Sequence, residues 1–182
     1  MITENRLEIE IKIKVESLDP LRHRIRLLPA VLAAERGFER NVVFDTDQKL
    51  LQKRGLLLRL RQQGTQTILT MKAPVQGDSI YKVREETEVQ VSDFANMEKI
   101  ILGIGFREYF VYEKFREVYE ALGVHIMVDE TPIGNYIEIE GRPAKIDAVA
   151  ARLGFTAADY ISDSYYRLFL KSGRSGHMVF SA

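Results

Sequence analysis

The sequence predicts a single α+β domain built on antiparallel strands, and three observations support this prediction. Residues 7–15 alternate apolar and charged side chains without a break, which is the period of two that a half-buried strand requires. Short turn-forming segments join most of the later strand-like stretches, and helix-like stretches are interposed. The chain has 182 residues, of which 46% are hydrophobic and 29% charged, as expected for one folded domain with a substantial core.

The first helix is expected directly after the first strand. Asp19 is the candidate cap, and Pro20 suits the first helical position. The pattern predicts that this helix continues to about residue 35, with a kink or break near Pro29, and that it ends at Gly37.

Strand patterns account for most of the remaining chain. The expected strands are residues 40–45, 56–62, 67–72, 80–91, 110–118, 124–130 and 136–140. Residues 73–79 contain Pro74 and Gly77 and are expected to form a loop.

Three further helices are expected from their end signals. Ser92 or Asp93 would cap the first of them, Pro143 would begin the second, and Gly154 would end it. The expected helices are residues 93–102, 143–154 and 165–171. The chain contains no linker or repeat, so residues 1–171 are expected to form one domain and residues 172–182 a loose, polar tail.

Composition excludes several functions. Lys plus Arg (26) equals Asp plus Glu (26), so there is no overall positive field to attract a nucleic acid polymer or an anionic membrane. The absence of cysteine excludes disulfides, thiol catalysis and thiolate zinc sites, and it fits a reducing compartment. The longest apolar run has eight residues, far fewer than the roughly 20 that a bilayer helix needs. We therefore expect a cytoplasmic protein that binds neither nucleic acid polymers nor membranes, and we leave open whether it forms a homodimer.

The strands sort their charged side chains onto one face. Residues two apart on a strand point to the same side. The polar residues that share a face in this way are Glu8, Glu10, Lys12 and Lys14; Arg59 and Arg61; Thr70 and Lys72; Lys82, Arg84, Glu86 and Glu88; Lys114 and Arg116; His125 and Asp129; and Glu138 and Glu140.

A solvent-exposed face with ion pairs of about 0.2 to 1 kcal/mol each would explain any single strand. The sorting of acids and bases into separate pairs favours a sheet that closes with its charged faces inward. Divalent cations would balance the acids there, and a polyanion would balance the Lys and Arg, because Mg²⁺ prefers carboxylates and phosphates and Arg matches phosphate geometry. The residue types therefore indicate a metal-assisted polyphosphate site.

The same residues carry a family resemblance. Glu8-Ile9-Glu10-Ile11-Lys12 resembles the ExExK signature of the CYTH superfamily, also called triphosphate tunnel metalloenzymes. The order and spacing of the later motifs extend the likeness from about residue 7 to 171. These motifs are Arg59-Leu60-Arg61, Thr70-Met71-Lys72, the segment from Lys82 to Glu88, Lys114-Phe115-Arg116, Asp129 and Glu138-Ile139-Glu140.

The resemblance implies an eight-stranded antiparallel β-barrel with helices packed outside and a small triphosphorylated substrate bound within. It also implies Mg²⁺ or Mn²⁺ as cofactor. The implied metal ligands are Glu8, Glu10, Asp129, Glu138 and Glu140, and Glu8, Glu10, Lys12 and Asp129 would be catalytic. The implied substrate-binding residues are Lys12, Arg59, Arg61, Lys72, Lys82, Arg84, Lys114 and Arg116. The roles of Glu86, Glu88 and His125 stay open.

Three functions are compatible with this resemblance. The leading hypothesis is hydrolysis of a phosphoanhydride bond in inorganic triphosphate, thiamine triphosphate or a nucleoside triphosphate. The alternative is a class IV adenylate cyclase, which converts ATP to cyclic AMP and pyrophosphate. The cyclase pattern places His-Phe six residues before the first Glu, whereas this chain has Ile2-Thr3 there. A non-catalytic polyphosphate or nucleotide sensor ranks third. Such a sensor would need the Lys and Arg residues but not the acids, and all the acids of the family pattern are present.

Overall fold

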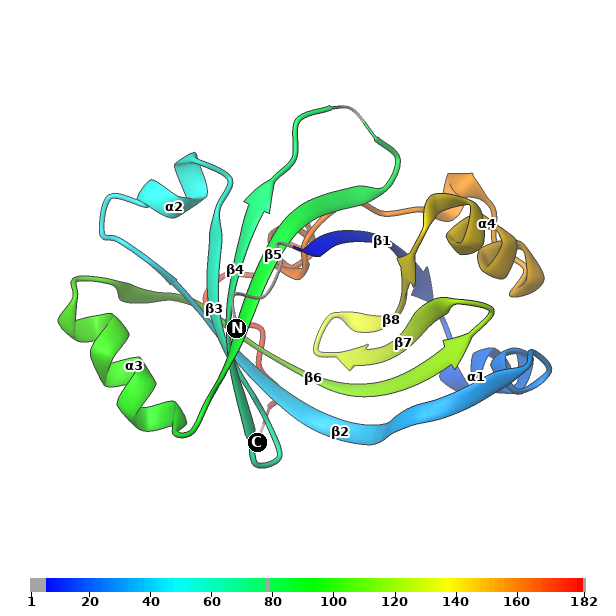
Figure 1. The fold of residues 1–182 in the computed structure, drawn as a ribbon, viewed down its shortest axis with the longest axis horizontal. Helices are drawn as coiled ribbons and strands as arrows, with labels where there is room; N and C mark the ends of the chain where they lie inside the picture. The colour runs from blue at the N-terminus through cyan, green and yellow to red at the C-terminus, as the bar shows by residue number, and fades with distance from the viewer. Residues whose placement is uncertain (1–5, 78, 182) are drawn as a thin grey trace.

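The computed structural model describes residues 6–77 and 79–181, which form a closed eight-stranded barrel (Figure 1). The strands are β1 (Arg6–Val15), β2 (Ala30–Asp45), β3 (Leu57–Gln63), β4 (Gln66–Pro74), β5 (Lys82–Val91), β6 (Arg107–Ala121), β7 (Val124–Thr131) and β8 (Gly134–Gly141). Around the barrel they follow the order β1-β5-β4-β3-β2-β6-β7-β8. Every neighbouring pair is antiparallel, which confirms the predicted fold class.

The helices of the described residues are α1 (Leu18–Arg26), α2 (Leu50–Lys53), α3 (Phe94–Gly103), α4 (Pro143–Arg152) and α5 (Tyr165–Lys171), with a short 3-10 turn at Ala157–Asp159. Four of these helices pack on the outside of the barrel (Figure 1), and the fifth, α5, contributes residues to the lining of its interior cavity. In Figure 1, α1 and α4 lie on one side of the barrel, and α2 and α3 lie on the other. Among residues 6–77 and 79–181, no helix is both long and apolar enough to cross a membrane.

The apolar core lies between the barrel wall and the helices. The outward faces of β1, β7 and β8 meet α1 and α4 in the largest cluster, which includes Ile11, Ile126, Ile137, Leu21 and Ile146. Complete burial of side chains of this size contributes about 1.5 to 3 kcal/mol each. This arrangement leaves inward-facing positions for the charged residues, beside a second cluster in which Phe110, Tyr112 and Tyr165 line the cavity.

The first predicted helix is too long. The observed helix α1 ends at Arg26, before Pro29, and its N-cap is Ser17 rather than Asp19. Residues 30–36 instead begin β2, whose pairing with β6 starts at Ala30 and Ala121 and contains register shifts near Ala34. The segment is rich in good helix formers, but the long ribbon of backbone hydrogen bonds with β6 overrides that local preference.

The C-terminal tail is also different from the prediction. The backbone N–H of Met178 donates to Val111 O at 2.9 Å, and Glu113 N–H donates to Met178 O at 2.9 Å. The Met178 side chain is completely buried against α5 and β6. The tail is therefore tied to a stretch of β6 that β7 does not reach, because the pairing of β6 with β7 begins only at Phe115. The sequence analysis also missed α2, whose single turn gives no amphipathic period.

Candidate active site in the barrel interior

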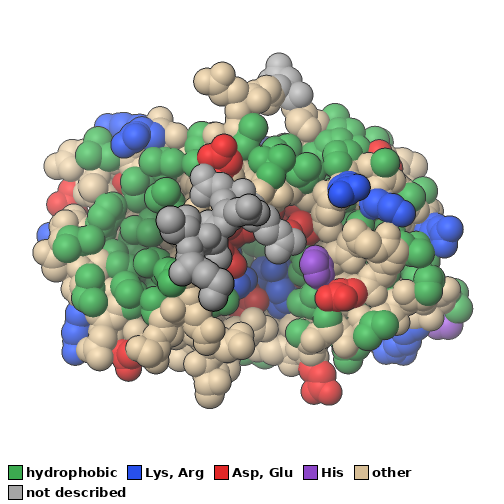
Figure 2. Space-filling view, viewed as in Figure 1, with side chains coloured by type: hydrophobic (Ala, Val, Ile, Leu, Met, Phe, Trp, Pro, Cys, Tyr) green, Lys and Arg blue, Asp and Glu red, His purple; other side chains and the backbone are tan. Residues whose placement is uncertain are grey.

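A cavity of about 550 Å³ occupies the barrel interior. Charged side chains from seven of the eight strands line it. They are Glu8, Glu10 and Lys12 of β1; Asp45 of β2; Arg59 and Arg61 of β3; Lys72 of β4; Lys82, Arg84, Glu86 and Glu88 of β5; Lys114 and Arg116 of β6; and Glu138 and Glu140 of β8. Acidic and basic side chains lie together in a hollow near the centre of the face in Figure 2. The structure thus brings together all eight predicted cationic residues and four of the five predicted metal ligands.

The acids of β1 are held by lysines from neighbouring strands. Both carboxylate oxygens of Glu8 lie 2.6 Å from Lys72 Nζ, and Glu10 Oε1 lies 2.5 Å from Lys82 Nζ. Burial raises the pKa of Glu10, but the charges of Lys82, Lys12 and Lys72 together outweigh burial, so that the pKa falls to about 2. Glu10 is therefore a carboxylate at every physiological pH.

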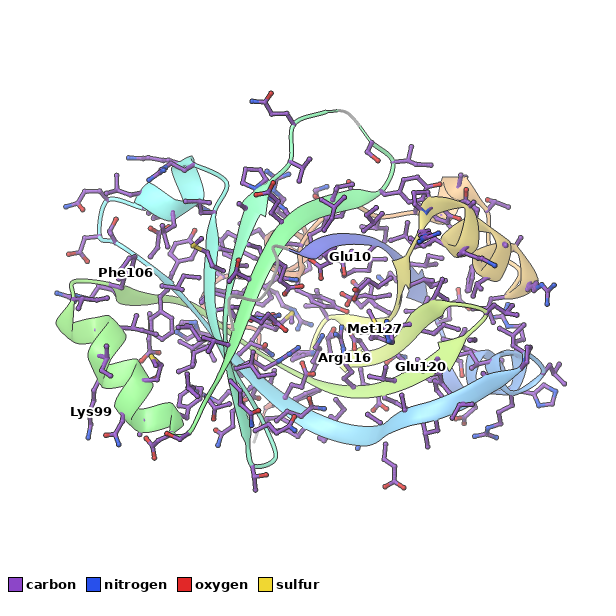
Figure 3. The ribbon with its side chains drawn as sticks, viewed as in Figure 1. Glu10, Lys99, Phe106, Arg116, Glu120 and Met127 are labelled. Carbon is purple, nitrogen blue, oxygen red and sulfur yellow. The ribbon has the colours of Figure 1, made fainter. Side chains whose placement is uncertain are left out.

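Lys12, the last residue of the ExExK pattern, is paired with Glu138. Its Nζ lies 2.6 Å from Glu138 Oε1, and only 2% of its side chain is exposed. The same ammonium group lies 4.5 Å from the centre of the Tyr165 ring. Burial opposes the charged form of Glu138, but Lys12 and then Arg116 hold its pKa well below the usual value. Figure 3 shows Arg116 inside the ring of strands, on the side of the barrel that carries β6 and β7.

Asp129 differs from the other predicted metal ligands because it does not line the cavity. Its side chain is completely buried in the barrel wall. Lys114 Nζ donates to Oδ2 at 3.0 Å, Arg116 donates to both oxygens at 2.7 and 2.6 Å, and the Tyr165 hydroxyl donates at 2.6 Å. Among the described residues, the Asp129 carboxylate therefore accepts hydrogen bonds from two cationic residues, Lys114 and Arg116, and from Tyr165.

Arg59 and Arg61 lie side by side on β3. Arg59 donates to Thr70 Oγ1 at 3.1 Å and to the Tyr112 hydroxyl at 3.3 Å, and Glu88 lies within 3.7 Å of Arg61. Burial and the positive charge of Arg59 lower the pKa of Arg61. Two buried guanidinium groups that repel each other make this wall a strong site for an anion.

Sequence reasoning missed three interior residues. Glu39, Asn41 and Tyr112 are buried at 1%, 0% and 8% exposure. Glu39 and Asn41 share the inward face of β2. Glu39 lies before the expected strand of residues 40–45, whereas Asn41 lies inside that strand but carries no charge, so the sorting of charges does not single it out. The alternation of Glu39, Asn41, Val43 and Asp45 was the available signal.

His125 lies outside the cavity lining, and its role stays open. Its side chain is 41% exposed, and its Nε2 lies 3.5 Å from Glu120 Oε1. Glu86 and Glu88 do line the cavity, where they contact Lys72 and Thr70 at 3.1 and 2.7 Å.

The donor atoms fit a hard divalent cation. Glu8 and Glu10 share one face of β1, and Glu140 faces Glu10 in the register of β1 with β8, so three carboxylates line neighbouring positions of one wall of the cavity. Within the described ranges, no three acidic or histidine side chains are yet close enough to hold a metal ion. Lys72 and Lys82 occupy the carboxylates of Glu8 and Glu10, so an ion would bind there in exchange for the two lysine contacts.

Comparison with known proteins agrees with this geometry. The family model described as the CYTH domain matches residues 6–165. This chain belongs to the CYTH family. A protein of Methanocaldococcus jannaschii named a "putative adenylate cyclase" is 27% identical over 135 residues, which cover 74% of this chain and 76% of that protein.

Solved structures share the CYTH fold. A "putative adenylate cyclase" from Vibrio parahaemolyticus has a TM-score of 0.82 with 17% identity, covering 92% of this chain and 99% of that one. A conserved protein from Pyrococcus furiosus has a TM-score of 0.74 with 25% identity, covering 88% and 99%. An adenylyl cyclase-like protein from Hippeastrum, whose structure is described as revealing a dominant triphosphatase activity, has a TM-score of 0.65 with 20% identity, covering 92% and 97%. Membership of this family indicates an enzyme.

Proposed function

We propose that this protein is a divalent-metal-dependent enzyme that binds a small triphosphorylated substrate in the barrel and hydrolyses a phosphoanhydride bond. The observation that carries this proposal is that the barrel strands place eight Lys and Arg side chains and the acids of the ExExK pattern in one cavity of about 550 Å³. A linear triphosphate is a compact polyanion that could contact several of these cations at once.

The cationic walls would hold the phosphate chain and stabilise the charge that develops on it. Arg59 and Arg61 form one wall, and Lys114 and Arg116 form another. Loss of one preorganised donor of this kind typically raises the barrier by about 2.7 to 4 kcal/mol.

Glu8 and Glu10, with Glu138 and Glu140, would hold Mg²⁺ or Mn²⁺. The ion would supply charge neutralisation on the phosphate oxygens and a lower pKa for a water nucleophile. Glu8 and Glu10 would exchange their present contacts with Lys72 and Lys82 for the ion, and the two ammonium groups would then be available to bind phosphate oxygens.

Asp129 would act through its neighbours. Because its oxygens already accept from Lys114, Arg116 and Tyr165, we propose that it fixes those cations in place. This proposal differs from the direct metal-binding role that the family pattern implies for Asp129, which stays a prediction.

The alternative function is that of a class IV adenylate cyclase, which the names of the relatives from Methanocaldococcus and Vibrio favour. The dominant triphosphatase activity described for the Hippeastrum protein favours hydrolysis. The segment that differs from the cyclase pattern, Ile2-Thr3, lies outside the described residues. A cytoplasmic location without nucleic acid or membrane partners stays a prediction from composition.

A substrate panel separates these functions. Purified protein is incubated with ATP, thiamine triphosphate and inorganic triphosphate, each with Mg²⁺, with Mn²⁺ and with EDTA, and free phosphate and cyclic AMP are both measured. Hydrolysis predicts metal-dependent phosphate release without cyclic AMP. Formation of cyclic AMP from ATP would support the cyclase, and tight triphosphate binding without turnover would support a sensor.

A further inference from the structure

Glu39 is a buried carboxylate to which the proposed reaction assigns no role. The register of β2 with β6 places it opposite Lys114, and its side chain is 2% exposed. Its Oε2 lies 3.6 Å from Lys114 Nζ and accepts no hydrogen bond from any described residue. It lies behind the residues that line the cavity.

The charges that act most strongly on the Glu39 carboxylate are all positive. The cations that act on it are Lys114, Arg116, Arg61 and Arg59, which we call the four-cation cluster. Burial raises the pKa of Glu39, but the four-cation cluster outweighs burial and lowers the pKa to about 2. Glu39 is therefore ionised, and its charge acts on two walls of the cavity at the same time.

Its contacts differ from those of the other acids of the site. Glu8 lies 2.6 Å from Lys72, and Asp129 lies 2.6 Å from Arg116 and 3.0 Å from Lys114, in short pairs that fix the positions of these cations. Among the described residues, Glu39 forms one ion pair, in which its Oε2 lies 3.6 Å from Lys114 Nζ, and its charge acts on four cations. A carboxylate in this position mainly lowers the positive electrostatic potential of the cluster, and it does little to orient any one of the cations.

Asn41 marks a second position of the same kind. It follows Glu39 on the inward face of β2 and lies opposite Arg61 in the register with β3. Its side chain is completely buried, and neither its amide nitrogen nor its amide oxygen has a hydrogen-bond partner among the described residues. The chain thus offers an adjacent site at which a second negative charge can be introduced without a change in side-chain shape.

We propose that Glu39 is a built-in counter-anion of the four-cation cluster, which keeps the cluster compact before substrate binds and limits how tightly the cluster holds a polyphosphate. This inference rests on the proposed function, and it adds that Glu39 sets the affinity of the site for polyphosphate. A limit of this kind favours release of the phosphate products, because they bind the same cations as the substrate.

The test is the dissociation constant of inorganic tripolyphosphate, measured by titration calorimetry in EDTA at fixed ionic strength and near neutral pH. Glu39→Gln should bind tripolyphosphate about tenfold more tightly than the wild type, because one opposing charge is removed from the cluster. Its melting temperature without ligand should fall, since the four cations then repel one another. Asn41→Asp should bind about tenfold more weakly. Glu117→Gln is the matched control, because Glu117 accepts a hydrogen bond from Arg22 at 2.8 Å on the outer face of β6. The Glu117→Gln protein should bind tripolyphosphate with the same affinity as the wild type.

A folded Glu39→Gln protein with unchanged or weaker affinity would overturn the proposal, because a carboxylate that only orients the cations predicts weaker binding. If Glu39→Gln fails to fold, Asn41→Asp decides, and unchanged affinity in that variant would overturn the proposal. If the wild-type protein does not bind tripolyphosphate at all, the proposed function is contradicted as well. Wild-type binding that none of the variants changes would remove only the role of Glu39.

Discussion

Arg116 of β6 and Asp129 of β7 form a two-point ion pair inside the barrel wall, with Nε 2.7 Å from Oδ1 and Nη2 2.6 Å from Oδ2. The same guanidinium group contacts Glu138 of β8. One side chain therefore connects three consecutive strands at the cavity surface. Because Asp129 is completely buried, the position of Arg116 is fixed from behind, on the side away from the substrate.

Replacing Asp129 should destabilise the protein strongly. Asp129→Asn leaves Lys114 and Arg116 buried without their main counter-charge, and breaking a buried pair typically costs about 3 to 5 kcal/mol. Urea unfolding measures the loss. Asp163→Asn, which breaks the pair with the largely exposed Lys171, should cost less than about 1 kcal/mol. Equal losses in the two variants would show that Asp129 does not hold the barrel wall together.

Removing the first acid of the ExExK pattern should abolish turnover and preserve the fold. In Glu8→Gln the Lys72 ammonium group keeps Glu86 at 3.1 Å, so no buried charge is left alone. We expect metal-dependent phosphate release to fall by more than about 100-fold, with the circular dichroism spectrum unchanged. Glu85→Gln, on the exposed outer face of β5, is the control. A Glu8→Gln protein with full metal-dependent turnover would refute the role of Glu8.

The guanidinium group of Arg59 should not be replaceable by an ammonium group. Arg59 donates to Thr70 and Tyr112 while it faces the cavity, and a lysine cannot reproduce this forked geometry. For Arg59→Lys we expect kcat/KM to fall by about 100-fold or more. Steady-state phosphate release measures it, with the outward Arg107→Lys as control. An unchanged kcat/KM would mean that Arg59 does not bind the phosphate chain.

The stability of the protein should fall in acid partly through Glu39. Its pKa in the folded protein is about 2, below the usual 4.5, so its contribution is complete above about pH 4.5 and is lost as the pH falls toward 2. Urea unfolding from about pH 6 to about pH 3 should show a smaller decline for Glu39→Gln than for the wild type. Parallel pH profiles would contradict the depressed pKa.

The C-terminal tail should contribute to stability at one residue in particular. Met178 is completely buried, whereas its neighbour Val179 is 42% exposed. Met178→Ala should cost about 2 to 5 kcal/mol, and Val179→Ala should cost less than about 1 kcal/mol. Urea unfolding of the two variants distinguishes a packed tail from a loose one. Similar small effects at both positions would support the loose tail that composition predicts.

The inward-facing charges were the most predictable part of the site. A strict period of two fixes which side chains of β1, β3, β5 and β8 share a face, and the sorted charges required a closed interior. The helix signals at Asp93 and Pro143 were reliable because a cap and an N-terminal proline act locally.

The errors arose where distant pairing decides the local structure. Residues 30–36 form a strand only because β6 lies beside them, and Met178 is buried only because β6 has an unpaired stretch near Val111. The error at residues 30–36 concealed Glu39, because the expected strand began at residue 40. The enclosure of Asp129 was also not predictable, since it depends on Tyr165 and Lys114 from distant elements.

The central claim is that a polyphosphate and its metal bind inside the barrel, and a crystal structure with tripolyphosphate and Mn²⁺ tests it most directly. Anomalous scattering locates Mn²⁺ independently of any assumption about the site. The account predicts a manganese peak beside Glu8 and Glu10, with phosphate density against Arg59, Arg61 and Arg116. Manganese and phosphate found only on the outer surface, with no density in the barrel, would contradict it.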